Sequence, residues 1–373
     1  MCPPLPPPRG VFAVILVLVV VGMMMLVPRS PSNGQLIRPL ELNVSLSHKK
    51  VRQESLWGGG GSRLLPWGQD SVTLCLFVLQ LVHQHVLQVL QGQCRRGNTR
   101  KALLARLPAS SRDTQPFLWS DVGVPEELFL HQLPFGFQGV QFKPQVENRS
   151  NRCQRCVVIG NGGILRGLEL GPLLDRFDTV IRLNSAPLGK FSVDVGKRTS
   201  IRMSYPESTL HHWSDTDPHT LLVTVAYKWV DMSWMSLLDR LFYWQKVPDQ
   251  VPLEPENFRL LNPTVIREAA LDLLKYPTPR WRLWGWDTNI PTLGVTALNL
   301  ASLLCDEVSL AGFGYTMSRV AAPLHYYDDL PMNAILQQKM HNVDRETELL
   351  RSLVKEGGVS DLTGGIHCSF CSS

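Results

Sequence analysis

The chain has little charge and few cysteines for its length. Of its 373 residues only 18% are charged, compared with roughly 25% in a typical soluble domain. With 44% hydrophobic residues, this composition excludes a disordered chain and a coiled coil. Eight cysteines are too few for a small disulfide-held scaffold. The net charge of +5 is too small to indicate a nucleic-acid partner, and we find no internal repeats.

The shortage of charge is concentrated in residues 11–27 (VFAVILVLVVVGMMMLV), which contain no charged side chain. Their length lies at the short edge of the transmembrane range. The end of the run, Met23-Met24-Met25-Leu26, offers no small-x-small cleavage site. We therefore predict an uncleaved signal anchor with a short cytoplasmic tail at residues 1–10 and a lumenal remainder.

Two glycosylation sequons after the anchor agree with a lumenal chain: Asn43-Val44-Ser45 and Asn148-Arg149-Ser150.

The segment after the anchor divides into two parts. Residues 28–70 are rich in Pro, Gly, Ser and Asn, which predicts a flexible stem. Residues 72–91 carry apolar residues at helical spacing with Gln and His between them, which favours an amphipathic helix on a core or membrane surface over a second span.

From about residue 150, short β-rich runs alternate with helical patterns. The runs are 156–159, 179–183, 221–225, 258–261 and 307–311, and the helical patterns include 265–274 and 292–304. This alternation predicts an α/β domain with a mostly parallel sheet.

Two polar segments follow predicted strands. Residues 157–163 (VVIGNGG) run from a strand into a glycine-rich turn, where the backbone can approach a phosphate and Asn161 can bond a base or sugar. The spacing differs from the dinucleotide fingerprint, so a simple tight turn remains the alternative. Asn184 ends the next strand, where open α/β sheets bind ligands, although a turn-capping role is equally compatible.

Three further residues suggest proton transfer or anion binding. Thr292 is placed to cap the helix that follows it, whose start is a natural phosphate site. His325 and His341 have the side chain suited to proton transfer near neutral pH, with a structural role as the alternative. Glu346 would orient the His341 imidazole if the chain turns between them.

The cysteine spacing leaves several readings open. The pairs Cys153-x-x-Cys156 and Cys368-x-x-Cys371 are compatible with a zinc site, and the first also with a redox pair. Their separation exceeds the usual zinc spacing, and a lumenal compartment favours disulfides.

Two other motifs carry a weaker signal. Asp215-Thr216-Asp217 matches a pattern that holds a divalent metal in many glycosyltransferases, but it lies in an apparent loop, so we expect no metal there. The basic run 95–101 is interpreted as a solvated face, with phosphate binding as the alternative.

Residues 134–366 resemble the animal sialyltransferases, glycosyltransferase family 29. The large motif resembles residues 153–207, the small motif 291–314, the third motif 325–327 and the very small motif 341–346. The resemblance implies a Rossmann-like variant of the GT-A sheet flanked by helices. The catalytic domain would span 134–373, preceded by a stem and N-terminal lumenal helices at 28–133 and by the single transmembrane helix.

The resemblance also implies an activity and its residues. Members of the family transfer sialic acid from CMP-sialic acid with inversion and without a metal or other cofactor. His341 would be the general base, and His325 would stabilise the departing phosphate. The residues implied for nucleotide-sugar binding are Asn161, Asn184, Tyr205, Thr292, Gly294 and Gly314.

The family pattern also pairs cysteines. It implies a disulfide between Cys156 and Cys305. Cys153 would then pair upstream with Cys94, with Cys75 as the alternative. Cys368 and Cys371 have no implied partner.

The resemblance extends to a subgroup, the α2,3-sialyltransferases that act on galactose. Segments such as ILRGLELG and FRLLNP resemble those that act on lactosylceramide to make the ganglioside GM3, while the HYY motif leaves Galβ1-3/4GlcNAc termini as the alternative acceptor. Trp281, Trp284 and Trp286 alternate with Arg, which is compatible with a membrane-interface loop, a sugar-stacking loop or core packing.

We expect a single-pass type II protein of the Golgi membrane. Its partners would be CMP-sialic acid and a galactose-terminated glycolipid or glycan, with no nucleic acid and with homo-oligomerisation left open. A soluble dinucleotide oxidoreductase and a membrane-anchored lectin-like protein are the alternatives from other classes. The first lacks its glycine fingerprint, and the second has no need of both histidines.

Overall fold

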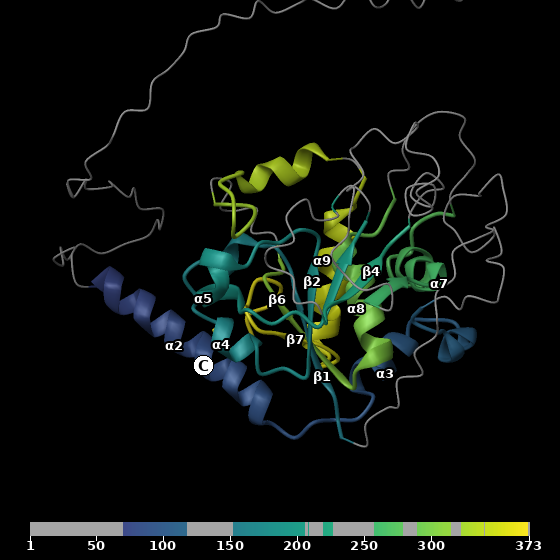
Figure 1. The fold of residues 1–373 in the computed structure, drawn as a ribbon, viewed down its shortest axis with the longest axis horizontal. Coiled ribbons are helices and arrows are strands. Elements are labelled where there is room, and N and C mark those ends of the chain that lie inside the picture. Colours follow the sequence, from purple (N-terminus) through teal and green to yellow (C-terminus); the bar gives the residue numbers. More distant parts are fainter. Residues whose placement is uncertain are drawn as a thin grey trace, which may run out of the picture. The chain divides into compact units, whose positions relative to one another are not determined.

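The computed structural model describes residues 70–117, 152–205, 208, 219–226, 257–278, 289–314, 322–338 and 340–371, all within the compact unit Leu65–Ser373 (Figure 1). Several sequence predictions fall outside these residues: the anchor at 11–27, Asn43, Asn148, Asp215, Asp217 and the three tryptophans at 281, 284 and 286. Among the helices that are described, none is long and apolar enough to cross a membrane.

The centre of this unit is a seven-stranded sheet in which every neighbouring pair is parallel. Its order is β5-β4-β3-β2-β1-β6-β7. The strands are β1 (Arg155–Ile159), β2 (Thr179–Leu183), β3 (Ile201–Ser204), β4 (Leu221–Thr224), β5 (Phe258–Leu260), β6 (Glu307–Ala311) and β7 (Ser360–Asp361). The predicted α/β fold with a parallel sheet is confirmed.

Two of these strands were not predicted. β3 reads Ile-Arg-Met-Ser, and its two apolar residues, separated by Arg202, are too few to form a recognisable β-rich run. β7 has two residues, too few for any period to appear in the sequence. The other five strands coincide with the β-rich runs.

The strand order changes direction between β1 and β6. From β1 the chain builds outward through β2, β3, β4 and β5, and then returns to place β6 on the other side of β1. In open parallel sheets the crevice beyond the carboxyl ends at such a reversal is where ligands bind. The turns that follow Ile159 and Ala311 therefore mark the place to look for a site.

Both faces of the sheet are covered, since neighbouring residues of the central strands β1, β2 and β6 enter two separate cores. Cys156 and Val158 of β1 belong to one core, whereas Val157 and Ile159 belong to the other. The first core includes residues of α3 (Asn98–Leu104), α7 (Pro263–Arg267) with its π-helical extension (Glu268–Leu273), α8 (Leu293–Leu304) and α9 (Val343–Lys355) (Figure 1). The second includes residues of α2 (Asp70–Gln91), α4 (Gly171–Leu174) and α5 (Ser192–Val195). Short helical turns complete the described elements: η1 (Ala109–Asp113), η3 (Gly163–Leu165), η4 (Gly189–Phe191) and η8 (Met332–Gln337).

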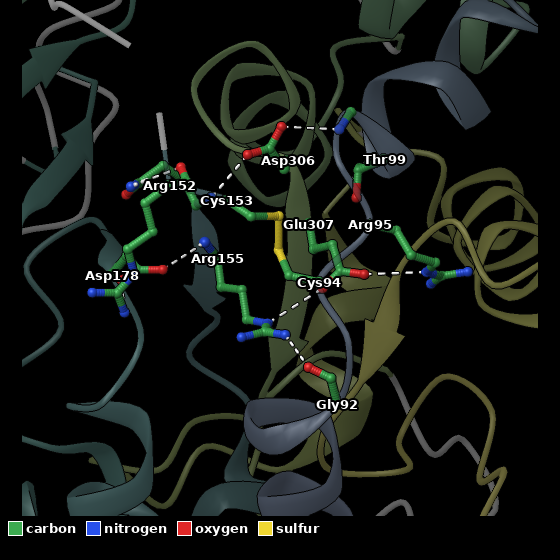
Figure 2. The surroundings of a disulfide bond; sticks show 12 residues. Gly92, Cys94, Arg95, Thr99, Arg152, Cys153, Arg155, Asp178, Asp306 and Glu307 are labelled. Atoms are coloured by element: carbon green, nitrogen blue, oxygen red, sulfur yellow. Dashed lines mark hydrogen bonds and ion pairs between the residues drawn. A yellow bond between two sulfur atoms is a disulfide. The ribbon is translucent and has the colours of Figure 1, made fainter. Parts of the chain in front are cut away.

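Both disulfides implied by the family pattern are present. Cys156–Cys305 joins β1 to the residue that ends α8, and Cys94–Cys153 joins the segment after α2 to the start of β1. The second lies among charged groups at the amino end of the sheet (Figure 2). There the Asp306 carboxylate accepts hydrogen bonds from the backbone N–H groups of Gly97 and Gln154, at 2.9 and 2.8 Å.

Two arginines of the basic run 95–101 contact carboxylates of the folded domain. Arg95 Nε lies 3.2 Å from one carboxylate oxygen of Glu307, whose other oxygen lies 3.3 Å from Arg155 Nε (Figure 2). Arg100 is mostly buried and donates to Asn299 beside the carboxylate of Glu268. The interpretation as a solvated face holds for Arg95, Arg96 and Lys101, which are exposed. It is wrong for Arg100, whose side chain is only 12% exposed.

Candidate functional site

The glycine-rich turn after β1 lies directly against the turn after β6. Gly160 N–H donates to Ala311 O at 2.8 Å, and Gly162 N–H donates to Gly312 O at 3.0 Å. A Cβ at Gly162 would stand 2.5 Å from Gly312 O, and one at Gly163 would stand 2.2 Å from Pro323 O. Glycine is thus required here so that three backbone segments can meet at the strand-order reversal.

Two asparagine side chains at this edge present polar atoms without a partner. Asn161 Oδ1 and Asn184 Oδ1 are shielded from solvent and accept no hydrogen bond. The last residue of β3, Ser204, has a buried Oγ in the same condition. An unsatisfied buried acceptor costs about 1–3 kcal/mol, so such groups call for a partner that a ligand can provide. They lie at the carboxyl ends of three consecutive strands, β1, β2 and β3.

Asn184 is held by a residue that the sequence reading missed. It has a positive φ of 56°, a conformation that asparagine tolerates better than most residues. The buried Arg202 donates through Nη1 to Asn184 O at 2.8 Å and to Ala186 O at 3.3 Å. A buried guanidinium with two loop carbonyls thereby shapes the Asn184 turn. The only signal in the sequence was an Arg inside an otherwise apolar strand.

The third motif packs on the glycine-rich turn. Tyr326 N–H donates to Asn161 O at 2.9 Å, and His325 forms a β-bridge with Gly162. His325 Nδ1 lies 2.8 Å from Asp328 Oδ2, and its ring stacks on Tyr327 with centroids 5.0 Å apart. When Nδ1–H donates to Asp328, Nε2 is the ring nitrogen left for a substrate atom.

Tyr205 belongs to the same group of side chains. Burial, the Asp328 carboxylate and the nearby Tyr205 raise the pKa of Tyr327 to about 12, while a hydrogen bond with the Asn161 side chain opposes them. Tyr327 therefore keeps its proton at physiological pH. Residues separated by 166 positions in sequence, from Asn161 to Tyr327, thus form one cluster at the carboxyl edge.

Thr292 begins α8 as predicted, and its environment shows an unexpected partner. Its Oγ1 accepts from Val295 N–H at 3.4 Å, the bond of a helix N-cap. The backbone N–H and the hydroxyl of Thr292 both donate to the Glu346 carboxylate, at 2.8 and 2.5 Å. The expectation that Glu346 orients His341 is therefore wrong, because both of its oxygens are engaged by Thr292.

His341 is oriented instead by a backbone carbonyl. Its Nδ1 lies 2.8 Å from Ile290 O, and Ile290 N–H donates to Met340 O at 3.0 Å. Burial lowers the pKa of His341, and the bond to Ile290 opposes this only in part. With Nδ1–H donated to a carbonyl, the neutral ring keeps a lone pair on Nε2, the state required of a general base.

Phe313 joins these two groups of residues. A Cβ at Gly160 would stand 3.2 Å from its ring, and one at Gly294 would stand 2.8 Å from it. The next residue, Gly314, has φ +95°, and a Cβ there would stand 2.0 Å from Gly365 O. The small-motif glycines therefore allow close packing of the walls around Phe313. The sequence reading missed this phenylalanine because an aromatic residue after a strand is usual in any core.

The last two cysteines of the sequence, for which the family pattern implied no partner, are also paired. Cys368 and Cys371 form a disulfide with each other. Since Cys153 and Cys156 are bonded elsewhere, the zinc and redox readings of these pairs are wrong. Throughout the described part of the chain, no group of three or more His, Cys, Asp or Glu side chains is placed to hold a metal ion.

Comparisons with known proteins agree on one family. The sequence model of glycosyltransferase family 29 (sialyltransferase) matches residues 111–358. Lactosylceramide alpha-2,3-sialyltransferase of Rattus norvegicus is 44% identical over 313 residues, which cover 78% of this chain and 80% of that protein. The CMP-N-acetylneuraminate-beta-1,4-galactoside alpha-2,3-sialyltransferase of Homo sapiens is 37% identical over 297 residues, covering 74% and 78%.

A solved structure shares the fold. It is a mammalian sialyltransferase crystallised in complex with Gal-beta-1-3GalNAc-ortho-nitrophenol, and it superimposes with a TM-score of 0.55 at 22% sequence identity. The superposition covers 72% of this chain and 98% of that one. At this identity the likeness concerns the fold alone.

Proposed function

Because the chain belongs to glycosyltransferase family 29, the sialyltransferases, we propose that it transfers sialic acid from CMP-sialic acid to the 3-hydroxyl of a terminal galactose on lactosylceramide. The product would be the ganglioside GM3, formed with inversion at the anomeric carbon. The observation that carries the donor assignment is the pair of buried, unpartnered amide oxygens of Asn161 and Asn184 at the strand-order reversal.

The donor fits this edge on chemical grounds. The hydroxyls and amino group of a cytidine nucleoside can donate to the Asn161 and Asn184 oxygens and thereby satisfy both. The phosphate of CMP would lie toward the N-terminus of α8, beyond its cap Thr292, where the helix dipole favours a negative charge. A monophosphate donor carries no diphosphate to be neutralised, so we propose a reaction without metal or other cofactor.

His325 would act on the leaving group. Cleavage of the glycosidic bond places negative charge on the CMP phosphate and positive charge on the sugar ring. As an imidazolium, with its Nδ1–H donated to Asp328, His325 can donate Nε2–H to that phosphate in the transition state. The β-bridge of His325 with Gly162 keeps the imidazole beside the nucleotide turn.

His341 would act on the acceptor. A galactose hydroxyl is a weak nucleophile until a base takes its proton as it attacks. His341 has the required free Nε2, and its lowered pKa keeps the ring neutral in mildly acidic surroundings. Inversion follows if the hydroxyl attacks from the face opposite CMP in a single displacement.

The acceptor assignment rests on similarity. The identity is 44% to the lactosylceramide enzyme and 37% to the beta-1,4-galactoside enzyme, over similar shares of this chain. The second candidate is α2,3-sialylation of Galβ1-3/4GlcNAc termini, which that relative and the His325-Tyr326-Tyr327 motif favour.

The remaining expectations concern the location of the enzyme. We propose that residues 11–27 anchor it in the Golgi membrane as a single-pass type II protein with a lumenal catalytic domain. Glycosylation at Asn43 and Asn148 and three disulfides would suit an oxidising lumen.

The test is transfer of labelled sialic acid from CMP-sialic acid to lactosylceramide, N-acetyllactosamine and Galβ1-3GalNAc acceptors. We expect preferred transfer to lactosylceramide by the wild type and little by His341→Ala. His83→Ala serves as the matched control. His83, on α2, is also half-buried, and its ring nitrogen Nε2 lies 2.7 Å from the backbone carbonyl oxygen of Leu168. Preference for lactosamine would select the second candidate, and no transfer to any acceptor would reject both.

A further inference from the structure

The chain beyond the family match folds into a compact C-terminal knuckle, residues 361–371. The match ends at residue 358, and this segment begins as β7 ends. The knuckle is closed by the Cys368–Cys371 disulfide. It packs on α2 through Phe370, whose ring lies 4.6 Å from that of His85.

One buried carboxylate organises the knuckle. Asp361 is 2% exposed and accepts five hydrogen bonds from the residues that follow it. Its Oδ1 accepts from the N–H and hydroxyl of Thr363 and from Gly364 N–H, at 3.1, 3.3 and 3.0 Å. Its Oδ2 accepts from the N–H groups of Ile366 and His367, at 2.7 and 3.0 Å. Hydrogen bonds to a charged acceptor are stronger than those between neutral groups, so the backbone conformation of residues 361–371 depends on Asp361.

The knuckle contacts the loop that follows β6. Gly312 N–H donates to Thr363 Oγ1 at 3.2 Å, and the same hydroxyl donates to Asp361. A Cβ at Gly365 would stand 2.1 Å from Phe313 O, and one at Gly314 would stand 2.0 Å from Gly365 O. The two backbones therefore touch with no side chain between them.

The contacted loop is the one that joins the candidate site. Gly312 accepts from Gly162 of the glycine-rich turn, and the Phe313 ring borders both Gly160 and Gly294. A shift of residues 312–314 would displace the walls on both sides of the nucleotide edge. Their position is fixed from the outside by the knuckle.

We propose that Asp361 is a positioning residue for donor binding, acting through Thr363 on the Gly312–Gly314 loop. This rests on the proposed function, since it takes CMP as the ligand of that edge. Asp361 touches no reacting atom in this arrangement. Its effect is on nucleotide affinity more than on the chemical step.

The test measures binding of CMP to the full-length protein by calorimetry, together with the KM for CMP-sialic acid, kcat and Tm. Thr363→Val preserves shape and removes the acceptor of Gly312 N–H. We expect it to weaken CMP binding by about fivefold or more, because a buried donor loses its partner. Thr363→Ser keeps the hydroxyl and should restore binding. Asp361→Asn replaces one acceptor oxygen by a donor and should weaken CMP binding further.

Thr220→Val is the matched control. Thr220 is 1% exposed, and its hydroxyl donates to Thr199 O at 3.1 Å, at the amino end of β4. It should lower Tm without changing CMP affinity. Unchanged CMP affinity in Thr363→Val would overturn the inference, whatever becomes of Asp361→Asn. A wild-type protein that binds no CMP would instead reject the proposed function.

Discussion

Glu346 should make the stability of this protein depend on pH. Its side chain is 4% exposed and lies among apolar residues of α9 and beside Thr292. Burial raises the pKa of Glu346 from 4.5 to about 7, although the two hydrogen bonds from Thr292 oppose the increase. The perturbation we propose is Glu346→Gln, which keeps the shape and removes the titration.

The sign follows from proton binding. Between pH 4.5 and about 7, the folded state holds a proton on Glu346 that the unfolded state has released. Stability therefore falls as pH rises through this range. A pKa moved from 4.5 to about 7 corresponds to about 3 kcal/mol of unfolding free energy. Relative to Glu346→Gln, the unfolding free energy of the wild type should fall by about 3 kcal/mol between about pH 4 and about pH 8.

The assay is urea unfolding followed by circular dichroism, without reductant so that the disulfides stay intact. Because all other groups titrate alike in both proteins, the difference between their unfolding free energies reports the titration of Glu346 alone. Glu356→Gln is the control with opposite sign. Hydrogen bonds from Arg106 and Ser352 lower the pKa of the exposed Glu356. The unfolding free energy of the wild type should therefore increase relative to that of this variant as pH rises. A difference for Glu346→Gln that does not change with pH would refute the burial argument.

Three further predictions follow from the site and its frame. His341→Ala should lower kcat by about 10²- to 10⁴-fold with CMP affinity retained. Since burial lowers the pKa of His341, the acid limb of the wild-type kcat/KM profile should lie below pH 6.5. An acid limb above that value would contradict the assignment. Replacing Cys156 and Cys305 by Ser should cost about 2–5 kcal/mol of unfolding free energy, measured by urea unfolding, because the bridge closes a long loop. Gly314→Ala should lower both Tm and CMP affinity, since its Cβ would meet Gly365 O at 2.0 Å in a backbone with φ +95°; a normal CMP affinity would show that the loop can shift.

The local elements could be read from the sequence because they depend on neighbours in the chain. The run at β1 shows four continuous apolar residues, those at β2 and β6 contain three apolar residues each, and Thr292 precedes a helical pattern in the position of a cap. β3 was missed because it has only two apolar residues, Ile201 and Met203, with the buried Arg202 between them. Loop carbonyls after β2 accept hydrogen bonds from this buried residue and help to stabilise its charge in the interior.

Within the candidate site, the motif residues could be named from the sequence and their partners could not. Glu346 was assigned to His341, its neighbour on the chain, yet it binds Thr292, which lies 54 positions away. Cys368 and Cys371 were left without partners and pair with each other. Phe313 and Asp361 were not identified, since neither carries a pattern that distinguishes it from an ordinary core or turn residue.

The sequence by itself determined five of the seven strands, the order of the motifs along the chain and the family to which they belong. These depend on short-range spacing and on residue chemistry, which are written in the chain directly. Only the tertiary structure decided the strand order, the meeting of the turns after β1 and β6, and the support that Asp361 gives to residue 312. Those contacts join segments about 50 to 150 residues apart. They form because burial of both sheet faces selects one path for the chain, and no local pattern records that path.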